Sequence, residues 1–255
     1  GQDCVAMCLN DMVCHGARPL FFLDYLACDR LNAETAAELV SGIVRAAATC
    51  GATLVGGETA EMPGVYTPGS YDVAGFAVGM VERHEVIHPG RIVGGETLIA
   101  LASNGLHSNG YSLLRATVED YRESWEGRPI WELLTEPTLL YAPAILELHN
   151  RVGVSGAAHI TGGGLYENVP RILPPHCDAT IYRSHIRELP VHRFLRTLRI
   201  DEEELYRTFN MGVGMVLAVA PEKEQEAIET VRSFSLEAYP VGEVTREGSG
   251  TLWLR

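Results

Sequence analysis

Residues 159–171 read HITGGGLYENVPR, and they contain a pattern that recurs along the chain. A short apolar strand runs into three consecutive glycines, and a helix is expected from about Leu165. Three glycines in a row give up local stiffness, so the chain must need a bare backbone there, either for a tight turn or for the close approach of a ligand. Strand, glycine loop and helix in this order are typical of an α/β protein.

The rest of the chain extends this pattern into two domains. Strands and helices alternate in both halves, which indicates an α/β fold of the α+β type in two or more layers. Turn-forming residues gather between 84 and 95. We therefore expect an N-terminal domain over residues 1–88 and a C-terminal domain over 89–255. The main expected strands cover 20–27, 71–82, 97–103, 157–161, 178–183 and 211–221, and the main expected helices cover 3–14, 32–51, 138–150, 190–207 and 222–234.

Composition excludes several classes of function. The 255 residues include 33 acidic and 20 basic side chains, a formal charge of -13, which argues against a nucleic-acid surface. The apolar runs fall short of the ~20 residues that a membrane helix needs, and the first residues lack the features of a signal peptide. We therefore expect a cytoplasmic protein. Its six cysteines form no C-x-x-C pair, so buried thiols are favoured over a zinc site.

Three glycine clusters are candidates for ligand binding: GGETAEMPG at 56–64, SNGLHSNGYS at 103–112, and HITGGGLYENVPR. In the second and third, a strand leads through glycines into a helix, an arrangement that directs backbone N–H groups at an anion such as phosphate. Neither matches a P-loop or a dinucleotide fingerprint. Tight turns without a ligand explain a single cluster equally well, but three clusters favour ligand binding.

Polar side chains beside these clusters could carry chemistry. His107 and His159 could meet a phosphate or transfer a proton, although a structural histidine is equally consistent with each position. Asp11, Glu58 and Glu61 are carboxylates of the kind that hold Mg²⁺ together with phosphate oxygens. For each taken alone, a solvated, capping or surface residue is the more common explanation. Asn210 precedes Gly212 and Gly214 and could bond a substrate amide or simply form a turn.

Taken together, these motifs resemble the phosphoribosylformylglycinamidine cyclo-ligases, also called aminoimidazole ribonucleotide synthetases, of purine biosynthesis. The resemblance covers nearly the whole chain in the family's order. It rests on CVAMCLNDMV, GARPLFFLDY, LVGGETAEMPGVY, YDVAGFAVG, GLHSNGYSLLR, HITGGGLYENVPRILP and YRTFNMGVGM.

The resemblance implies an ATP-dependent, Mg²⁺-dependent enzyme that closes the ring of formylglycinamidine ribonucleotide to give aminoimidazole ribonucleotide, ADP and phosphate. It also implies a homodimer formed through the sheet of the N-terminal domain. By similarity, His159 and Asn210 are catalytic, and Asp11 and Glu58, rather than Glu61, serve the metal or ATP. The implied substrate- and phosphate-binding residues are His107, Ser108, Asn109, Gly110, Gly162, Gly163 and Gly164. We further expect Gly163→Val to abolish ligand binding while leaving the fold largely intact.

One departure from the family pattern is visible. The family carries a further N-terminal segment with a glycine-rich stretch, a nucleotide-site lysine and a DGVGTK-like motif, and this chain begins after it. Three related enzymes are the nearest alternatives: formylglycinamidine ribonucleotide synthetase, selenophosphate synthetase and thiamine-phosphate kinase. A non-catalytic nucleotide-binding module is an alternative of another class.

Overall fold

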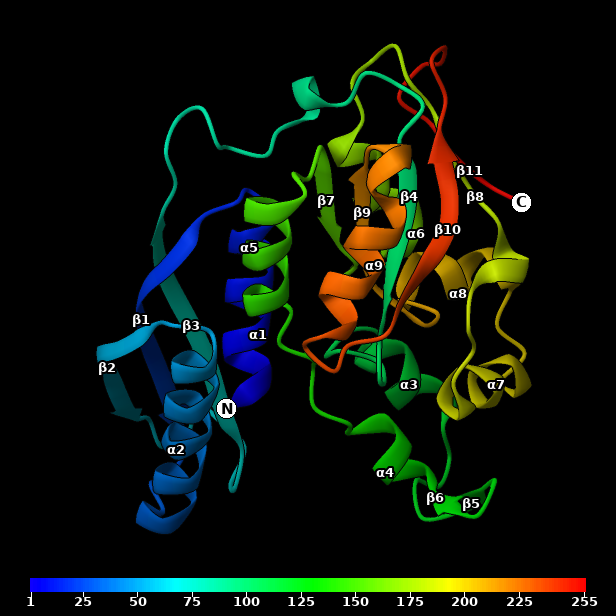
Figure 1. Cartoon of the computed structure of the whole chain (residues 1–255). Coiled ribbons are helices and arrows are strands. Elements are labelled where there is room, and N and C mark those ends of the chain that lie inside the picture. The colour runs from blue at the N-terminus through cyan, green and yellow to red at the C-terminus, as the bar shows by residue number, and fades with distance from the viewer. The chain divides into compact units, whose positions relative to one another are not determined.

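The computed structural model describes residues 1–255 and divides them into two compact units (Figure 1). Unit 1 comprises Gly1–Val86 and Leu140–Leu146, and unit 2 comprises Ile87–Leu139 and Glu147–Arg255. The first boundary lies close to the expected one at residue 88, but the return of the chain to unit 1 was not predicted. A buried hydrogen bond accompanies this return, because Tyr141 N donates to Asn10 Oδ1 at 2.9 Å.

Unit 1 is a three-stranded sheet with two helices on one face. The central strand β1 (Arg18–Cys28) pairs in parallel with β2 (Thr53–Glu61) and antiparallel with β3 (Tyr71–Met80). Helices α1 (Gln2–Val13) and α2 (Ala33–Thr49) pack on this sheet and on each other. The side chain of Asn32 accepts a hydrogen bond from Thr35 N at 3.0 Å, so it caps α2.

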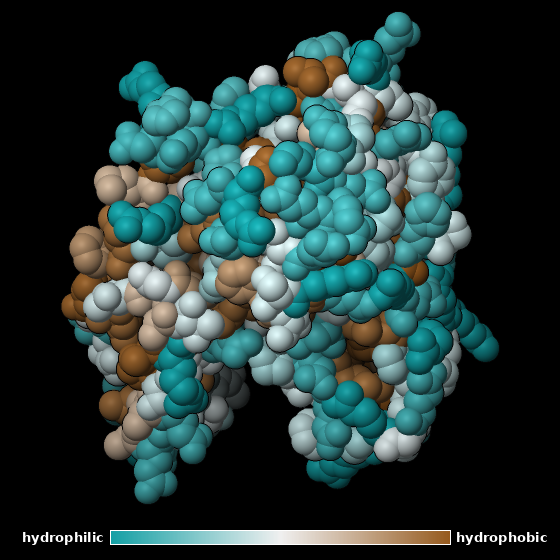
Figure 2. Space-filling view, in the orientation of Figure 1, coloured by the Kyte–Doolittle hydropathy of each residue, from teal (hydrophilic) through white to brown (hydrophobic).

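The other face of this sheet is apolar and exposed. Along β3, partly buried and exposed residues alternate, as expected when only one face of a strand is covered. Figure 2 shows the resulting hydrophobic surface over β1 to β3. Contiguous apolar surface of this kind marks an interaction site in a folded protein. The large apolar side chains exposed on these strands are Phe21, Leu23, Val55, Phe76, Val78 and Met80.

Unit 2 is built on a six-stranded sheet in the order β11-β8-β10-β4-β9-β7. Every neighbouring pair is antiparallel except β8 and β11. The strands β4 and β9 are almost completely buried, so both faces of the sheet are covered. The six strands are β4 (Thr97–Ala102), β7 (Gly156–His159), β8 (Ala179–Ile181), β9 (Val213–Val219), β10 (Ala238–Val244) and β11 (Leu252–Leu254).

Helices cover the two faces of this sheet. Helix α9 packs on β4 and β10, whereas Leu98 and Ala100 of β4 belong to a large apolar core with residues of α6, α7 and α8. The helical segments expected over 190–207 form two helices, α7 and α8, and Asp201 caps the second by accepting a hydrogen bond from Glu203 N at 2.8 Å. The helices after residue 100 are α3 (Tyr111–Thr117), α4 (Ile130–Leu134), α5 (Ala142–Arg151), α6 (Gly164–Asn168), α7 (Pro190–Thr197), α8 (Glu202–Thr208) and α9 (Glu224–Arg232). Helix α5 begins in unit 1 and ends in unit 2.

Smaller elements complete the fold. A hairpin of β5 (Ser124–Trp125) and β6 (Arg128–Pro129), which the sequence did not predict, precedes α4. Short 3₁₀ turns cover Pro89–Arg91, Val169–Ile172, Arg183–His185 and Pro221–Lys223. No helix has both the length and the apolar character that crossing a membrane requires.

One carboxylate, next to the start of β8, binds the loop that leads into the C-terminal strand β11. Asp178 Oδ1 accepts hydrogen bonds from Ser249 N at 2.7 Å and Thr251 N at 2.8 Å, and Oδ2 accepts one from Trp253 Nε1 at 2.8 Å. These donors favour the ionised form and lower the pKa of Asp178, the largest contribution coming from Ser249 N. The ionised Asp178 side chain therefore holds the loop 245–251 in place through hydrogen bonds.

We expect Asp178→Asn to lower the melting temperature near neutral pH. Because the folded-state pKa lies below its ordinary value of 3.8, the stabilisation is present above about pH 4 and is lost as the pH falls through the lowered pKa. The gap between wild type and variant should therefore close in strong acid. Thermal unfolding followed by circular dichroism from about pH 7 to about pH 2.5 measures this, and an equal gap throughout would contradict it.

Candidate active site

The second and third glycine clusters and the Asn210 segment meet at one edge of the unit 2 sheet. Strands β4 and β7 both pair antiparallel with β9, so their C-terminal ends lie where β9 begins. Two backbone hydrogen bonds fix this arrangement: Ser103 N donates to Gly212 O at 3.0 Å, and Ile160 N donates to Gly214 O at 2.9 Å. Loops far apart in the sequence are thereby brought together.

Two of the glycines are needed for this packing. A Cβ added at Gly110 would collide with the ring of Phe209, and a Cβ added at Gly164 would collide with the backbone of Tyr206. Both glycines also have positive φ, at 80° and 55°. The Tyr206–Phe209 segment is thus in direct contact with both loops, and no other residue type fits at either glycine.

Gly162 differs from these two glycines. Its backbone is not left-handed, and an added Cβ would meet nothing closer than Asn109 Oδ1 at 3.9 Å. Gly162 is exposed, and neither its N–H group nor that of Gly163 donates a hydrogen bond within the protein. Internal packing therefore does not explain the bare backbone at Gly162, whereas an anion bound by these two N–H groups does.

The loops also contain strained backbone. His107 and Ser108 have positive φ angles of 51° and 65°, and Met211 has one of 48°. Non-glycine residues seldom adopt this conformation, and it costs of order 1–3 kcal/mol at each position. Strain of this kind collects where a loop must present groups to a ligand. Here Ser108 is exposed and its Oγ lies 3.3 Å from Thr138 Oγ1.

The two predicted histidines are buried, His107 within the second glycine cluster and His159 at the start of the third. His159 ends β7 and is 5% exposed, and His107 is completely buried with its Nε2 at 2.7 Å from Asn104 Oδ1. Asn109, which is partly exposed, donates from Nδ2 to His107 O at 2.6 Å. The loop surface open to a ligand therefore consists of Ser108, Asn109 and the N–H groups of Gly162 and Gly163. His159 lies at the start of the third cluster.

Two buried asparagines brace the loops. Asn210 is completely buried: its Oδ1 accepts from Ser103 Oγ and Gly212 N, both at 3.0 Å, and its Nδ2 donates to Gly105 O at 2.8 Å. Because Asn210 is buried, it does not face a substrate in this structure, and the predicted catalytic role or bond to a substrate amide would have to act through the loop that it holds.

The second brace, Asn168, was missed by the sequence analysis. Its Nδ2 donates to Gly164 O at 2.8 Å and to Gly162 O at 3.2 Å, and the residue is 3% exposed. An asparagine one turn after a glycine run was the available signal, because its side chain can reach back to the carbonyl groups of the loop.

The predicted metal carboxylates lie in unit 1, on opposite faces of its sheet. Gly75 pairs with Asp24, and a Cβ added at Gly75 would lie 2.9 and 3.0 Å from two sulfur atoms of α1. Gly75 and Asp24 are therefore on the sheet face that α1 covers. Glu58 pairs with the next residue, Tyr25, and points to the other face. Asp11 is on α1. The two carboxylates therefore cannot ligate one ion within a single chain, and no group of three or more His, Cys, Asp or Glu side chains is arranged for a metal.

Comparison with known proteins agrees with this architecture. The N-terminal domain of the AIR synthase related proteins matches residues 1–81, and the C-terminal domain matches residues 94–255. The chain is 46% identical over 250 residues to the phosphoribosylformylglycinamidine cyclo-ligase of Clostridium novyi, which covers 98% of this chain and 76% of that protein. The chain belongs to this cyclo-ligase family. The cyclo-ligase of Clostridium perfringens is 44% identical over 251 residues, covering 98% and 75%.

Solved structures outside the cyclo-ligase family share the fold. Escherichia coli HypE, a hydrogenase maturation protein, superposes with a TM-score of 0.74 at 20% identity, covering 100% of this chain and 76% of that one. Thiamine-monophosphate kinase of Stenotrophomonas maltophilia gives 0.72 at 15% identity, covering 99% and 78%. At this identity the likeness concerns the fold alone. The predicted fold class and the cyclo-ligase resemblance are confirmed, and the alternative families are not favoured.

The different constraints on the glycines predict different effects of substitution. Valine at Gly162 is expected to leave the fold intact but to weaken binding of a phosphorylated ligand at least tenfold, because the side chain would cover the free N–H groups. Valine at Gly163 would require a φ near 93° and would meet Glu167 Cβ at 2.6 Å, so it should lower the free energy of unfolding by roughly 1–3 kcal/mol. The left-handed backbone at Gly163 thus argues against the expectation that Gly163→Val leaves the fold largely intact.

Calorimetric titration and thermal unfolding of the two variants separate these effects. Unchanged ligand affinity in Gly162→Val would show that its N–H group does not bind the ligand. A Gly163→Val variant as stable as wild type would show that the left-handed backbone there is not required.

Proposed function

We propose that this chain catalyses the ATP-dependent closure of formylglycinamidine ribonucleotide to aminoimidazole ribonucleotide, with release of ADP and phosphate. The observation that carries the proposal is the meeting of the two glycine loops and the Asn210 segment at one sheet edge, in a chain that is 44–46% identical to named cyclo-ligases. ATP use is supported by the family name and by a HypE structure solved with ATP, at a TM-score of 0.73.

In the proposed reaction the formyl oxygen takes the γ-phosphoryl group of ATP, a substrate nitrogen closes the ring, and phosphate leaves. Such transfers depend on positioning and on neutralising charge. The N–H groups of Gly162 and Gly163 and the hydroxyl of Ser108 would hold phosphate oxygens. His159, at the base of the same loop, would move the proton that ring closure releases.

The proposed use of Mg²⁺ rests on the family reaction, in which the ion would neutralise phosphate charge. Mg²⁺ is commonly held by one or two carboxylates together with phosphate oxygens. Asp11 and Glu58 are the predicted carboxylates, and their placement on opposite sheet faces means that each would act separately. The roles of the loop residues above do not depend on either.

Phosphate release from ATP in the presence of formylglycinamidine ribonucleotide tests the proposed function. We expect turnover by the chain joined to its family's N-terminal segment, and a loss of at least a hundredfold in His159→Gln, because the proton carrier is removed. His176→Gln is the matched control, since His176 is an exposed histidine outside the loops. A folded protein that releases no phosphate, or His159→Gln with normal turnover, would overturn the proposal.

We further propose that the exposed apolar face of unit 1 forms a homodimer, as the family resemblance implies. Water-exposed Phe76, at 65% exposure, lies on this face with its apolar neighbours, and burying it against a second copy would remove that surface from water.

Phe76→Glu should therefore convert the protein from dimer to monomer at micromolar concentration, because a charge cannot be buried there without a partner. Val93→Glu, at 73% exposure in unit 2, should remain dimeric. Sedimentation velocity distinguishes these outcomes. A monomeric wild type, or a dimeric Phe76→Glu variant, would refute the interface.

A further inference from the structure

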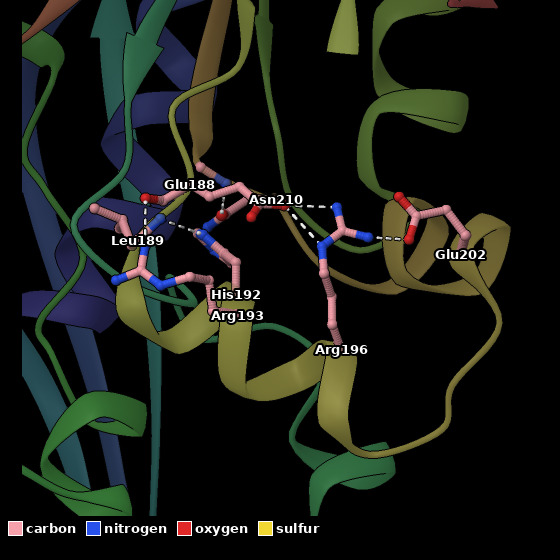
Figure 3. A network of polar contacts seen from close by, with 8 residues as sticks. Glu188, Leu189, His192, Arg193, Arg196, Glu202 and Asn210 are labelled. Atoms are coloured by element: carbon pink, nitrogen blue, oxygen red, sulfur yellow. Dashed lines mark hydrogen bonds and ion pairs between the residues drawn. The ribbon is translucent and has the colours of Figure 1, made fainter. Parts of the chain in front are cut away.

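Helix α7 buries a histidine that the reaction above does not use. His192 has no exposed surface, and Figure 3 shows its imidazole beside the backbone of Leu189 and the side chain of Asn210. Burying a polar ring costs free energy unless its nitrogen atoms form hydrogen bonds or other polar contacts. The groups around His192 therefore indicate its role.

One hydrogen bond to the His192 ring defines its tautomer. Leu189 N donates to His192 Nδ1 at 3.3 Å, so Nδ1 carries the lone pair and Nε2 carries the proton. Burial lowers the pKa of His192 to about 3, which keeps the ring neutral at ordinary pH. Nε2 has no partner of normal hydrogen-bond geometry, but the Asn210 side chain interacts with the ring and opposes the effect of burial on its pKa.

The Asn210 amide needs a defined orientation. Its oxygen faces two donors, Ser103 Oγ and Gly212 N, and its nitrogen faces one acceptor, Gly105 O. A flipped amide would oppose donor to donor at Gly212 N and acceptor to acceptor at Gly105 O, whereas the Ser103 hydroxyl can serve either orientation. A proton on His192 Nε2 favours the same orientation, because it attracts the amide oxygen and repels the amide N–H groups.

Charged contacts hold α7, and with it His192, in place. Arg196 donates from Nε to Glu188 Oε1 at 2.7 Å and is also paired with Glu202 at the start of α8 (Figure 3). Arg193 Nη1 donates to Glu188 O at 3.3 Å, and Arg193 is also paired with Glu126 of the hairpin at 2.7 Å. These pairs are partly exposed, so each stabilises little alone, but together they fix both the helix and the segment before it.

From these contacts we propose that His192 is a positioning residue, which orients the Asn210 amide and thereby holds the loop 103–110 against the start of β9. This inference rests on the proposed function, since the loop 103–110 is the one assigned to the substrate. His192 does not touch the substrate, because the ring is completely buried.

A pair of substitutions of similar length tests this role. His192→Gln keeps a side-chain donor and His192→Met does not, while both side chains are flexible enough to fit the space. We expect His192→Met to lower kcat/KM for formylglycinamidine ribonucleotide at least tenfold, mainly through KM, and His192→Gln to recover most of this loss. Val191→Ala, a buried apolar change in the same helix, is the control and should change thermal stability without changing KM.

Nuclear magnetic resonance of the wild-type protein and of two variants supplies a readout that does not depend on turnover. The ¹⁵N shifts of His192 should show the proton on Nε2, and the side-chain amide signal of Asn210 should move in His192→Met but not in Val191→Ala. A proton on Nδ1, an unmoved Asn210 signal, or equal kinetic effects in His192→Met and His192→Gln would overturn the inference. Because the tautomer is measured without substrate, failure here is distinguishable from failure of the proposed function.

Discussion

The candidate site depends on the close contact between the Tyr206–Phe209 segment and two glycines, Gly110 and Gly164. This contact leaves no room for a Cβ at either position, and it places Asn210 where its amide can reach the loop 103–110. Without the contact the two glycine loops would have no common support. The buried amide of Asn210 then supplies the polar part of the same junction, because each of its three contacts satisfies a group that would otherwise be buried without a partner.

The strain at His107, Ser108 and Met211 is compatible with a stable fold because the sheet beneath is almost completely buried. Strands β4 and β9 are packed on both faces, and the backbone hydrogen bonds at Ser103 and Ile160 fasten the loops to this rigid support. Left-handed residues of this kind persist only where the surrounding structure determines the backbone. The strain, the bare N–H groups and the buried braces are therefore parts of one arrangement.

Much of this arrangement could be predicted from the sequence, but the division of roles within it could not. Apolar patterns and glycine-to-helix transitions predicted the main strands and loops, and the family was indicated separately by the resemblance of seven sequence motifs. The sequence does not show why each glycine is needed. Gly110 and Gly164 leave room for a segment that is distant in the sequence, whereas Gly162 packs against no such segment. Strand register likewise decided the face on which Glu58 lies, and a shift of one residue would have reversed it.

Two residues escaped prediction for a related reason. Asn168 and His192 act through buried contacts with backbone or with another side chain, and neither lies in a motif whose spacing indicates chemistry. A histidine among apolar residues on a short helix is ordinarily interpreted as core. Two features distinguish His192 from an ordinary core residue: its tautomer, which Leu189 N fixes, and the nearby amide of Asn210.

The net charge of -13 places a further constraint on how such a protein can bind phosphorylated ligands. The overall field repels anions, and at physiological ionic strength it is screened over a Debye length of ~8 Å, so attraction has to be local. Arginine side chains could provide it, but Arg193, Arg196 and Arg207, which lie on the two helices before the Asn210 segment, are paired with carboxylates. Backbone N–H groups are a second source of donors. They carry no net charge and need an exposed, uncrowded backbone, and Gly162 provides that backbone.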